Sequence, residues 1–146
     1  MKLYLDNCSI QRPLDDKSQV RIAVEAEAIL GVIQLIEGGQ IDLVRSPALI
    51  YEINRTSNIE RRSYALQLIS KSKFEVRLSP AIEHRASQLN DLGIDTLDAL
   101  HLAFAEASQA DFFCTYDDKL IKRALALSNL AVVVVNPLEL IQEIEQ

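Results

Sequence analysis

The chain has 146 residues, of which 49% are hydrophobic and 25% charged, as in an ordinary globular protein. We therefore expect one domain over residues 1–146, and we exclude a disordered chain, a collagen and a miniature disulfide scaffold. The formal net charge of −6 argues against a protein that holds nucleic acid through its overall field. That argument weakens if several acids share one site for divalent cations, because the ions would cancel much of the negative charge.

The longest unbroken apolar run, 130–135, is far shorter than the about 20 residues that cross a bilayer. The N-terminus has no apolar segment followed by a cleavage site, so we expect no membrane span and a cytoplasmic location. Cys8 and Cys114 can form at most one disulfide. In a reducing compartment we expect two free thiols, the alternative being a close pair near two strand ends.

Apolar runs of strand length recur along the chain, and stretches with helical spacing lie between them. A turn-rich stretch through Pro13 follows the first run, and a long helix then ends at Gly38, either continuing through Gly31 or breaking there. Ser46–Pro47 and Ser79–Pro80 each have the form of an N-cap followed by proline at the first helical position. The predicted strands are 2–6, 41–44, 74–78, 112–115 and 131–135, and the predicted helices are 18–37, 58–72, 80–93, 96–108 and 118–127, with further helices starting at Pro47 and Pro137.

No two-residue hairpin turn joins any two of these strands, so helical crossovers must connect them. Such connections predict a parallel sheet with helices on both faces. The expected fold class is α/β: a doubly wound, three-layer α/β/α arrangement around a central parallel sheet of about five strands.

Two aspartates lie where ligands bind in open parallel sheets, beyond the carboxyl ends of the strands. Asp6 ends the first predicted strand, and Asp117 follows the fourth. An aspartate after a strand is most often a turn or cap residue. Taken alone, Asp117 fits that interpretation better, since Asp118 adjoins it and a helix starts there.

Two further acids lie on the apolar side of predicted helices. Glu52 shares a stripe with Leu49 and Ile53, and Asp98 shares one with Leu102. An inward carboxylate is costly unless a cation compensates it, although an acid in the first turn of a helix, such as Asp98, is also favoured by the helix dipole.

Four acids at one end of a sheet, with no Cys-His pairing and no glycine-rich phosphate loop, suit a hard cation such as Mg²⁺ or Mn²⁺. Oxygen ligands alone point away from zinc. Such a site can activate water and stabilise charge on a phosphate, so the implied reaction is phosphodiester hydrolysis.

Four segments combine into a pattern: Leu3–Asn7, Tyr51–Ile53, Leu97–Ala103 and Ala110–Asp117. This pattern resembles the PIN domain family, mostly metal-dependent ribonucleases that include the VapC-type toxins of prokaryotic toxin-antitoxin pairs. The match runs nearly from end to end. Asp-Ala-Leu-His-Leu-Ala followed by Ala-Asp-x-x-x-Thr-x-Asp is its specific part, whereas a strand ending in aspartate is common.

The resemblance implies that Asp6, Glu52, Asp98 and Asp117 are catalytic acids that coordinate one or two divalent ions. In family terms Asn7 and Ser9 border the first aspartate, and Thr115 supports the last one through its hydroxyl. Glu52 is the least secure of the four, with Glu60 as a substitute. The family also implies a homodimer and an antitoxin partner that covers the acidic groove.

Several basic residues near these acids are candidate RNA contacts, although a solvated helix face is the better single interpretation of each. They are Arg12, Arg55 and Lys119, with Arg61, Arg62, Lys122 and Arg123 beside them.

We expect no ligand role for the remaining titratable residues near these motifs. His101 fits a packed core histidine better than a metal ligand, and His84 has less to recommend it. Asp95 and Asp118 are expected to cap helices, with an outer-sphere contact as the alternative for Asp118.

The leading hypothesis is therefore a PIN-domain endoribonuclease, the toxin of a toxin-antitoxin pair, that uses Mg²⁺ or Mn²⁺ to cut RNA. A PIN fold retained as a binding or regulatory module is the second, and the acidic net charge favours it. A phosphatase or phosphoacceptor domain is the third. It is disfavoured because no second aspartate follows two residues after Asp6.

Overall fold

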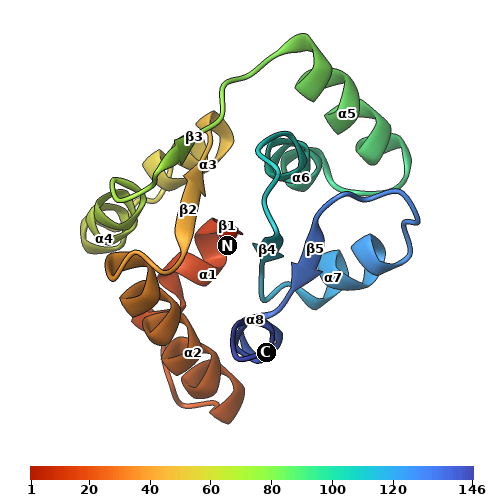
Figure 1. Cartoon of the computed structure of the whole chain (residues 1–146). Helices are drawn as coiled ribbons and strands as arrows, with labels where there is room; N and C mark the ends of the chain where they lie inside the picture. Colours follow the sequence, from red (N-terminus) through yellow and green to blue (C-terminus); the bar gives the residue numbers. More distant parts are fainter.

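Five short strands form one parallel sheet in the computed structural model, which describes all residues from 1 to 146 (Figure 1). The strand order is β3-β2-β1-β4-β5, so the chain starts in the centre, extends the sheet to one edge and then returns to build the other. This is the doubly wound α/β arrangement expected from the sequence. The strands are β1 (Lys2–Leu5), β2 (Asp42–Arg45), β3 (Phe74–Glu75), β4 (Phe112–Cys114) and β5 (Val133–Val135).

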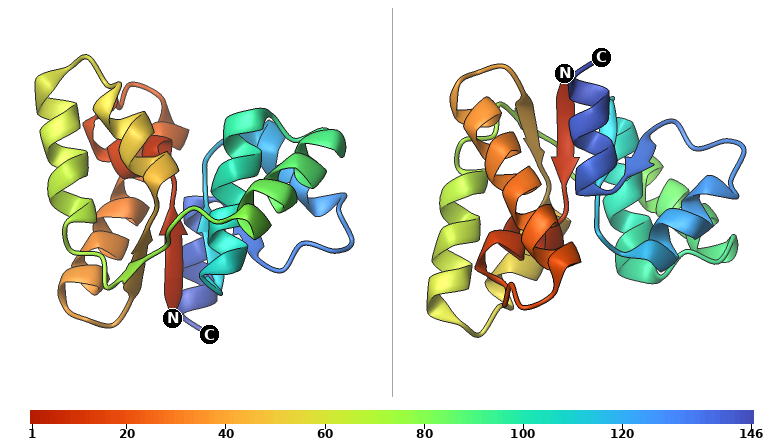
Figure 2. Two further views of the ribbon diagram at one scale, coloured as in Figure 1. Left: turned by 90° about the horizontal axis from the view of Figure 1, so that it is seen from above. Right: turned by 90° about the horizontal axis from the view of Figure 1, so that it is seen from below.

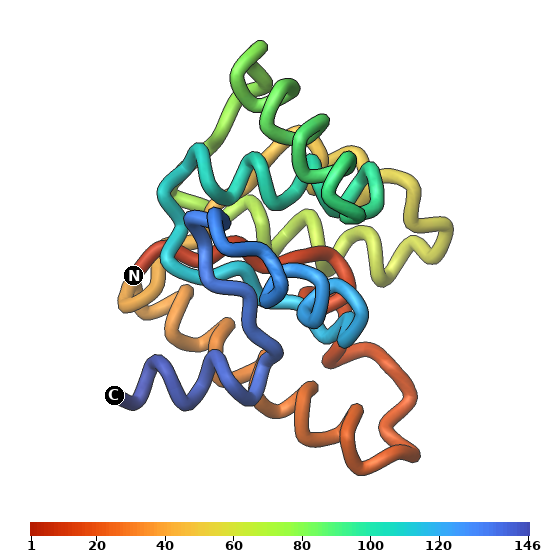
Figure 3. Tube along the Cα trace, turned by 90° about the vertical axis from the view of Figure 1, so that its right-hand side faces the viewer, coloured from red at the N-terminus to blue at the C-terminus, as the bar shows by residue number.

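Helices connect the strands and cover both faces of the sheet, and α5 leans over α6 while α8 lies beside α2 (Figures 2 and 3). The two termini lie on the same side of the molecule. None of the helices is long and apolar enough to span a bilayer. The helices are α1 (Asn7–Gln11), the 3-10 helix η1 (Arg12–Leu14), α2 (Val20–Glu37), α3 (Pro47–Asn54), α4 (Ile59–Ile69), α5 (Pro80–Asp91), α6 (Thr96–Ala107), α7 (Asp118–Leu125) and α8 (Pro137–Ile144).

Alternate residues of β1 enter two separate hydrophobic cores, because successive strand side chains point to opposite faces. Tyr4 packs into the core that includes Phe104 of α6. Leu3 and Leu5 pack into the core that includes Ile29 of α2. Leu3, Tyr4 and Leu5 are therefore fully buried, and the carboxyl end of β1 lies in the middle of the sheet.

Serine caps fix the starts of two helices, as the sequence predicts. Ser46 Oγ accepts from the backbone N–H of Leu49 at 3.1 Å at the start of α3, and Ser79 Oγ accepts from that of Ile82 at 3.3 Å at the start of α5. Each cap is followed by proline, whose missing N–H costs nothing in the first helical turn.

The structure differs from the predicted elements in three places. The stretch after Asp6, expected as turns, is α1 followed by η1. The predicted strand 74–78 shrinks to the two residues of β3, which lies at a sheet edge. The alternative of a break at Gly31 is wrong, because α2 is continuous from Val20 to Glu37.

Candidate functional site

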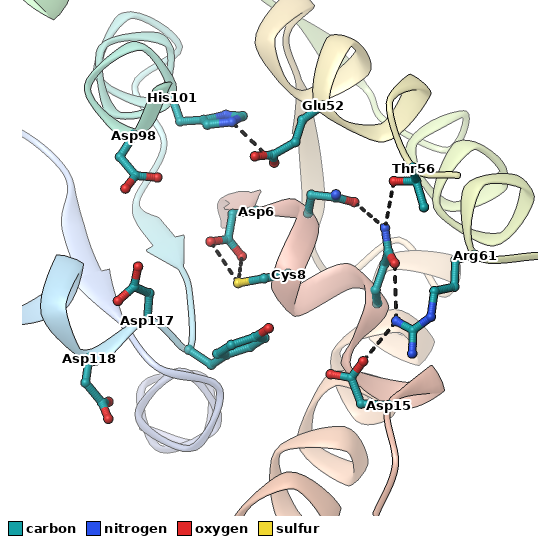
Figure 4. Close-up of a pocket in the computed structure, with 13 residues that line it drawn as sticks. Asp6, Cys8, Asp15, Glu52, Thr56, Arg61, Asp98, His101, Asp117 and Asp118 are labelled. Carbon is teal, nitrogen blue, oxygen red and sulfur yellow. Dashed lines mark hydrogen bonds and ion pairs between the residues drawn. The ribbon is translucent and has the colours of Figure 1, made fainter. Parts of the chain in front are cut away.

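The four acids expected from the sequence line one open pocket of about 630 Å³ (Figure 4). Asp6 follows β1 and Asp117 follows β4, so both lie at the carboxyl ends of adjacent strands. Glu52 enters the pocket from α3 and Asp98 from the first turn of α6. The remaining lining residues are Asn7, Cys8, Gln11, Asp15, Thr56, Arg61, His101, Tyr116 and Asp118.

Asp6 is buried, with 9% of its surface exposed, and every hydrogen-bond donor around it is neutral. Its Oδ1 accepts from the backbone N–H of Ser9 at 3.0 Å, which caps α1, and from the Cys8 thiol at 3.0 Å. Burial raises the pKa of Asp6, while hydrogen bonds from Thr115, Cys8 and Ser9 lower it in part. Asp6 therefore caps a helix and also presents a carboxylate at the pocket.

Asp98 is half-buried at the positive end of α6. Burial, together with the nearby charges of Asp6, Asp117 and Asp95, raises the pKa of Asp98 to about 6, although His101 opposes this shift. The charges of Asp6 and Asp117 therefore repel that of Asp98 across the pocket. A carboxylate held under such repulsion is stabilised when a cation enters.

Asp117 is exposed and serves as the N-cap of α7. Its Oδ1 accepts from the backbone N–H groups of Lys119 at 3.0 Å and Leu120 at 3.3 Å, which leaves Oδ2 free. Thr115 Oγ1 in turn accepts from the backbone N–H of Asp117 at 3.2 Å. The cap interpretation is confirmed, and it leaves one oxygen for a ligand.

Glu52 reaches the pocket from α3, whereas its proposed substitute Glu60 is an exposed residue of α4 outside the pocket. Glu52 Oε1 lies 3.5 Å from His101 Nε2. The structure therefore places Glu52, and not Glu60, at the pocket.

The residue types fit a hard divalent cation, since the pocket collects four carboxylates from four elements and Mg²⁺ and Mn²⁺ prefer oxygen ligands. As the side chains stand, no three His, Cys, Asp or Glu residues are close enough to hold one ion. Binding of one ion by three or more of these side chains therefore requires carboxylates of the pocket to move closer together.

The residues expected to support the acids take different places. Ser9 is buried, and its Oγ donates to the backbone carbonyl of Cys114 at 3.4 Å. Asn7 lines the pocket, and its Oδ1 accepts from Gln11 Nε2 at 2.8 Å. Thr115 is buried below Asp6 and Asp117.

Both cysteines are free thiols in the structure. Cys114 is buried, while the Cys8 thiol lies 3.0 and 3.2 Å from the two carboxylate oxygens of Asp6. Sequence reasoning gave Cys8 no place in the site. Its position two residues after Asp6 was the signal in the sequence that could have found it.

The basic candidates for RNA contact separate into paired and free residues. Arg12 is buried, its guanidinium binds Glu25 and Asp15, and it stacks on Tyr116 with 3.7 Å to the ring centre. These contacts make Arg12 part of the framework of the fold, with its guanidinium already occupied by Glu25 and Asp15. Lys119 is exposed beside Asp117.

The other arginines near the acids are also engaged. Arg55 Nη1 donates to Tyr51 Oη at 2.8 Å beside a neighbouring cavity. Arg61 lines the acidic pocket but pairs with Asp15 at 2.9 Å. Arg62 donates to the backbone carbonyl of Thr56 at 3.3 Å.

Neither of the two acids expected to cap helices, Asp118 and Asp95, makes a cap hydrogen bond. Asp118 lines the pocket, and Arg21 binds both its oxygens at 2.6 and 2.9 Å, which lowers the pKa of Asp118. Asp95 occupies the N-cap position of α6, but its side chain makes no cap hydrogen bond and lies 3.5 Å from Arg123.

A doubly wound parallel sheet with an acidic pocket at its carboxyl edge defines the class of the protein as an α/β protein with a candidate cation site. The model of the PIN domain family matches residues 12–126. The chain therefore belongs to the PIN domain family. No curated protein matches the chain.

Several solved structures share this fold over almost their whole length. FitAcB from Neisseria gonorrhoeae has a TM-score of 0.59 at 15% identity, covering 93% of this chain and 98% of its own. VapBC-1 from nontypeable Haemophilus influenzae has a TM-score of 0.59 at 13% identity, with 94% and 99% covered. VapBC2 from Rickettsia felis, bound to a DNA fragment from their promoter, has a TM-score of 0.55 at 16% identity, with 93% and 98% covered. At these identities the likeness concerns the fold.

Proposed function

We propose that the chain is a divalent-metal-dependent endoribonuclease that hydrolyses RNA phosphodiester bonds. The observation that carries this proposal is the convergence of Asp6, Glu52, Asp98 and Asp117 on one pocket without any Arg or Lys paired to them. Membership of the PIN domain family supports it, since the members are mostly nucleases. When bound, Mg²⁺ or Mn²⁺ supplies Lewis-acid chemistry that activates water and neutralises charge on the phosphate.

The chain's own residues hold the carboxylates ready for that ion. The N–H of Ser9 and the hydroxyl of Thr115 donate to Asp6 and offset part of the rise in its pKa that burial causes. The first turn of α7 fixes one oxygen of Asp117, so that the other faces the pocket. Lys119, exposed beside Asp117, is the lysine that we propose as a contact for a phosphate of the RNA.

We further propose that the protein acts as the toxin of a toxin-antitoxin pair and forms a homodimer. The fold shared with VapBC-1 and VapBC2 supports an antitoxin partner that covers the acidic pocket. Light scattering of the purified chain tests the dimer, and co-expression with the product of a neighbouring small gene tests the partner.

Cleavage of mixed RNA by purified, antitoxin-free protein tests the nuclease. We expect fragments with Mg²⁺ or Mn²⁺ and none with EDTA. Asp98→Asn should lower the rate by at least about 100-fold, as when one transition-state-stabilising group is lost. Asp95→Asn is the matched control, since Asp95 precedes the same helix outside the pocket.

A binding or regulatory module is the second candidate, because the side chains as they stand bring no three metal-ligating residues together. Folded wild-type protein that cuts none of a varied set of RNAs would favour this candidate. Equal cleavage by wild type and Asp98→Asn would identify a contaminating nuclease instead.

A further inference from the structure

A buried hydrogen-bonded network of three side chains lies beneath the acidic pocket and joins three of the elements that carry its acids. Tyr4 Oη lies 2.6 Å from Ser46 Oγ and 2.5 Å from His101 Nδ1. Ser46 caps α3, which carries Glu52, and His101 lies one turn after Asp98 on α6. Tyr4 itself lies two residues before Asp6.

At the His101 end of this network, the second ring nitrogen has no partner. His101 is 2% exposed, and its Nε2 is buried with no hydrogen-bond partner. His101 nevertheless lines the pocket, where its Nε2 is directed at Glu52 Oε1 at 3.5 Å (Figure 4). A buried polar atom without a partner is costly. The nearby Glu52 carboxylate is the group that can become the partner of Nε2.

The donor and acceptor of each hydrogen bond in this network can be assigned. Ser46 Oγ accepts from the backbone N–H of Leu49, so its own hydrogen is free to donate to Tyr4 Oη, its one other partner. A phenol, with an ordinary pKa of about 10, carries its hydrogen near neutral pH. Tyr4 therefore donates to His101 Nδ1, and the neutral imidazole must carry its hydrogen on Nε2.

The opposite direction leaves two groups unsatisfied. If Nδ1 carried the hydrogen and donated to Tyr4, then Tyr4 would donate to Ser46, and the serine hydrogen would have no acceptor. The bare lone pair of Nε2 would also face the carboxylate of Glu52, which is repulsive. The first direction gives the hydroxyl hydrogens of Ser46 and Tyr4 an acceptor each and directs the Nε2–H of His101 toward Glu52 Oε1, 3.5 Å away.

We infer that His101 is a positioning residue for Glu52: Ser46 and Tyr4 fix its imidazole so that the Nε2–H donates to the Glu52 carboxylate and orients it toward the cation. This inference rests on the proposed function, because it assumes that Glu52 is a ligand. It gives the histidine within the PIN motif a role between those of core residue and metal ligand. Partners that orient a ligand in this way commonly affect metal affinity as much as activity.

The hydrogen position can be read directly in metal-free protein by ¹⁵N NMR of the imidazole rings. His84→Gln leaves His101 as the only histidine, so its signals are assigned without ambiguity. We expect a protonated Nε2 and an unprotonated Nδ1 near neutral pH. Tyr4→Phe keeps the ring packing but removes the donor to Nδ1, so the preference for this tautomer should weaken. A protonated Nδ1 in the wild-type pocket would overturn the inference.

Mn²⁺ titrations of two matched variants test the effect on the ion. An asparagine amide reaches the position of Nδ1 and can bind Tyr4, whereas a glutamine amide reaches that of Nε2 and can bind Glu52. His101→Asn should bind Mn²⁺ about 10-fold more weakly than wild type, and His101→Gln should recover most of that loss. Equal affinity in His101→Asn and wild type would overturn the inference, as would equally weak binding by both variants.

The two experiments separate the two proposals. If wild-type protein binds no Mn²⁺ and cuts no RNA, the proposed function fails, while the imidazole spectra still report on the position of the His101 hydrogen. If His101→Asn does not fold by circular dichroism, Tyr4→Phe takes its place in the titration. Weaker Mn²⁺ binding in Tyr4→Phe then supports the inference, and unchanged binding contradicts it.

Discussion

Asp6 and Glu25 are both buried carboxylates, but the chain surrounds them differently. Glu25 is 2% exposed, and its Oε1 accepts from Arg12 Nε and Nη2 at 3.1 and 2.8 Å, while its Oε2 lies 3.4 Å from Arg21. Asp6, at 9% exposed, has only neutral donors around it, with Asp98 and Asp117 across the pocket. A buried acid with its cation supplied by the chain is part of the framework, and one without a cation indicates a site for an external ion.

The largest expected effect on the free energy of unfolding comes from Glu25, the buried acid of the framework. Glu25→Gln removes the negative charge and leaves the Arg12 guanidinium buried without its main partner. We expect the free energy of unfolding to fall by about 3 kcal/mol or more, measured by urea denaturation. Arg21→Gln is the control, because the Arg21 side chain is 49% exposed and should contribute less than about 1 kcal/mol. A loss for Glu25→Gln as small as that of the control would refute the framework assignment.

On the site side, an external cation should stabilise the folded chain. At 100 times its dissociation constant, Mg²⁺ should raise the free energy of unfolding by about 2.7 kcal/mol. Urea denaturation with and without Mg²⁺ measures the increment. We expect the same increment in Glu25→Gln and a much smaller one in Asp6→Asn. An undiminished increment in Asp6→Asn would place the ion elsewhere.

A smaller effect is expected from the pH dependence of the metal-free protein. The folded chain raises the pKa of Asp98 to about 6, above its ordinary value of 3.8, so it binds more protons than the unfolded chain between these values. This group therefore destabilises the fold at pH 7 and ceases to do so as the pH falls below about 4.

Asp98→Asn should remove this cost. Because Asp98 is half-exposed, solvent screening reduces the expected gain at pH 7 to about 1 kcal/mol, and the gain should shrink at pH 5. Asp95→Asn, at an exposed position before the same helix, should show no such pH-dependent gain. The explanation fails if Asp98→Asn is less stable than wild type at pH 7.

The sequence predicts the alternation of strands and helices because each strand is a short apolar run and several helices start at a serine-proline cap. It does not predict α1, since five residues are too few to show a helical period. It overestimates β3, because β2, the one strand that pairs with β3, ends at Arg45 and leaves no partner for the residues beyond the Arg45–Glu75 pair.

For the site, the strand-end and helix-stripe arguments predict the positions of all four acids, because both depend on local spacing. Two features lie beyond such arguments: the pairing of Arg12 with Glu25 and the approach of His101 to Glu52. Both join residues whose proximity depends on how helices pack across the sheet. Residue spacing along the chain carries no signal for that packing.

The central claim is that the acidic pocket binds a divalent cation through carboxylates that the chain leaves without a positive partner. Calorimetric titration of metal-free protein with Mn²⁺ tests it most directly, with wild type, Asp6→Asn and Asp95→Asn side by side. We predict binding by wild type and Asp95→Asn, and a loss of binding in folded Asp6→Asn. Equal binding by all three proteins, or none by wild type, would contradict the account.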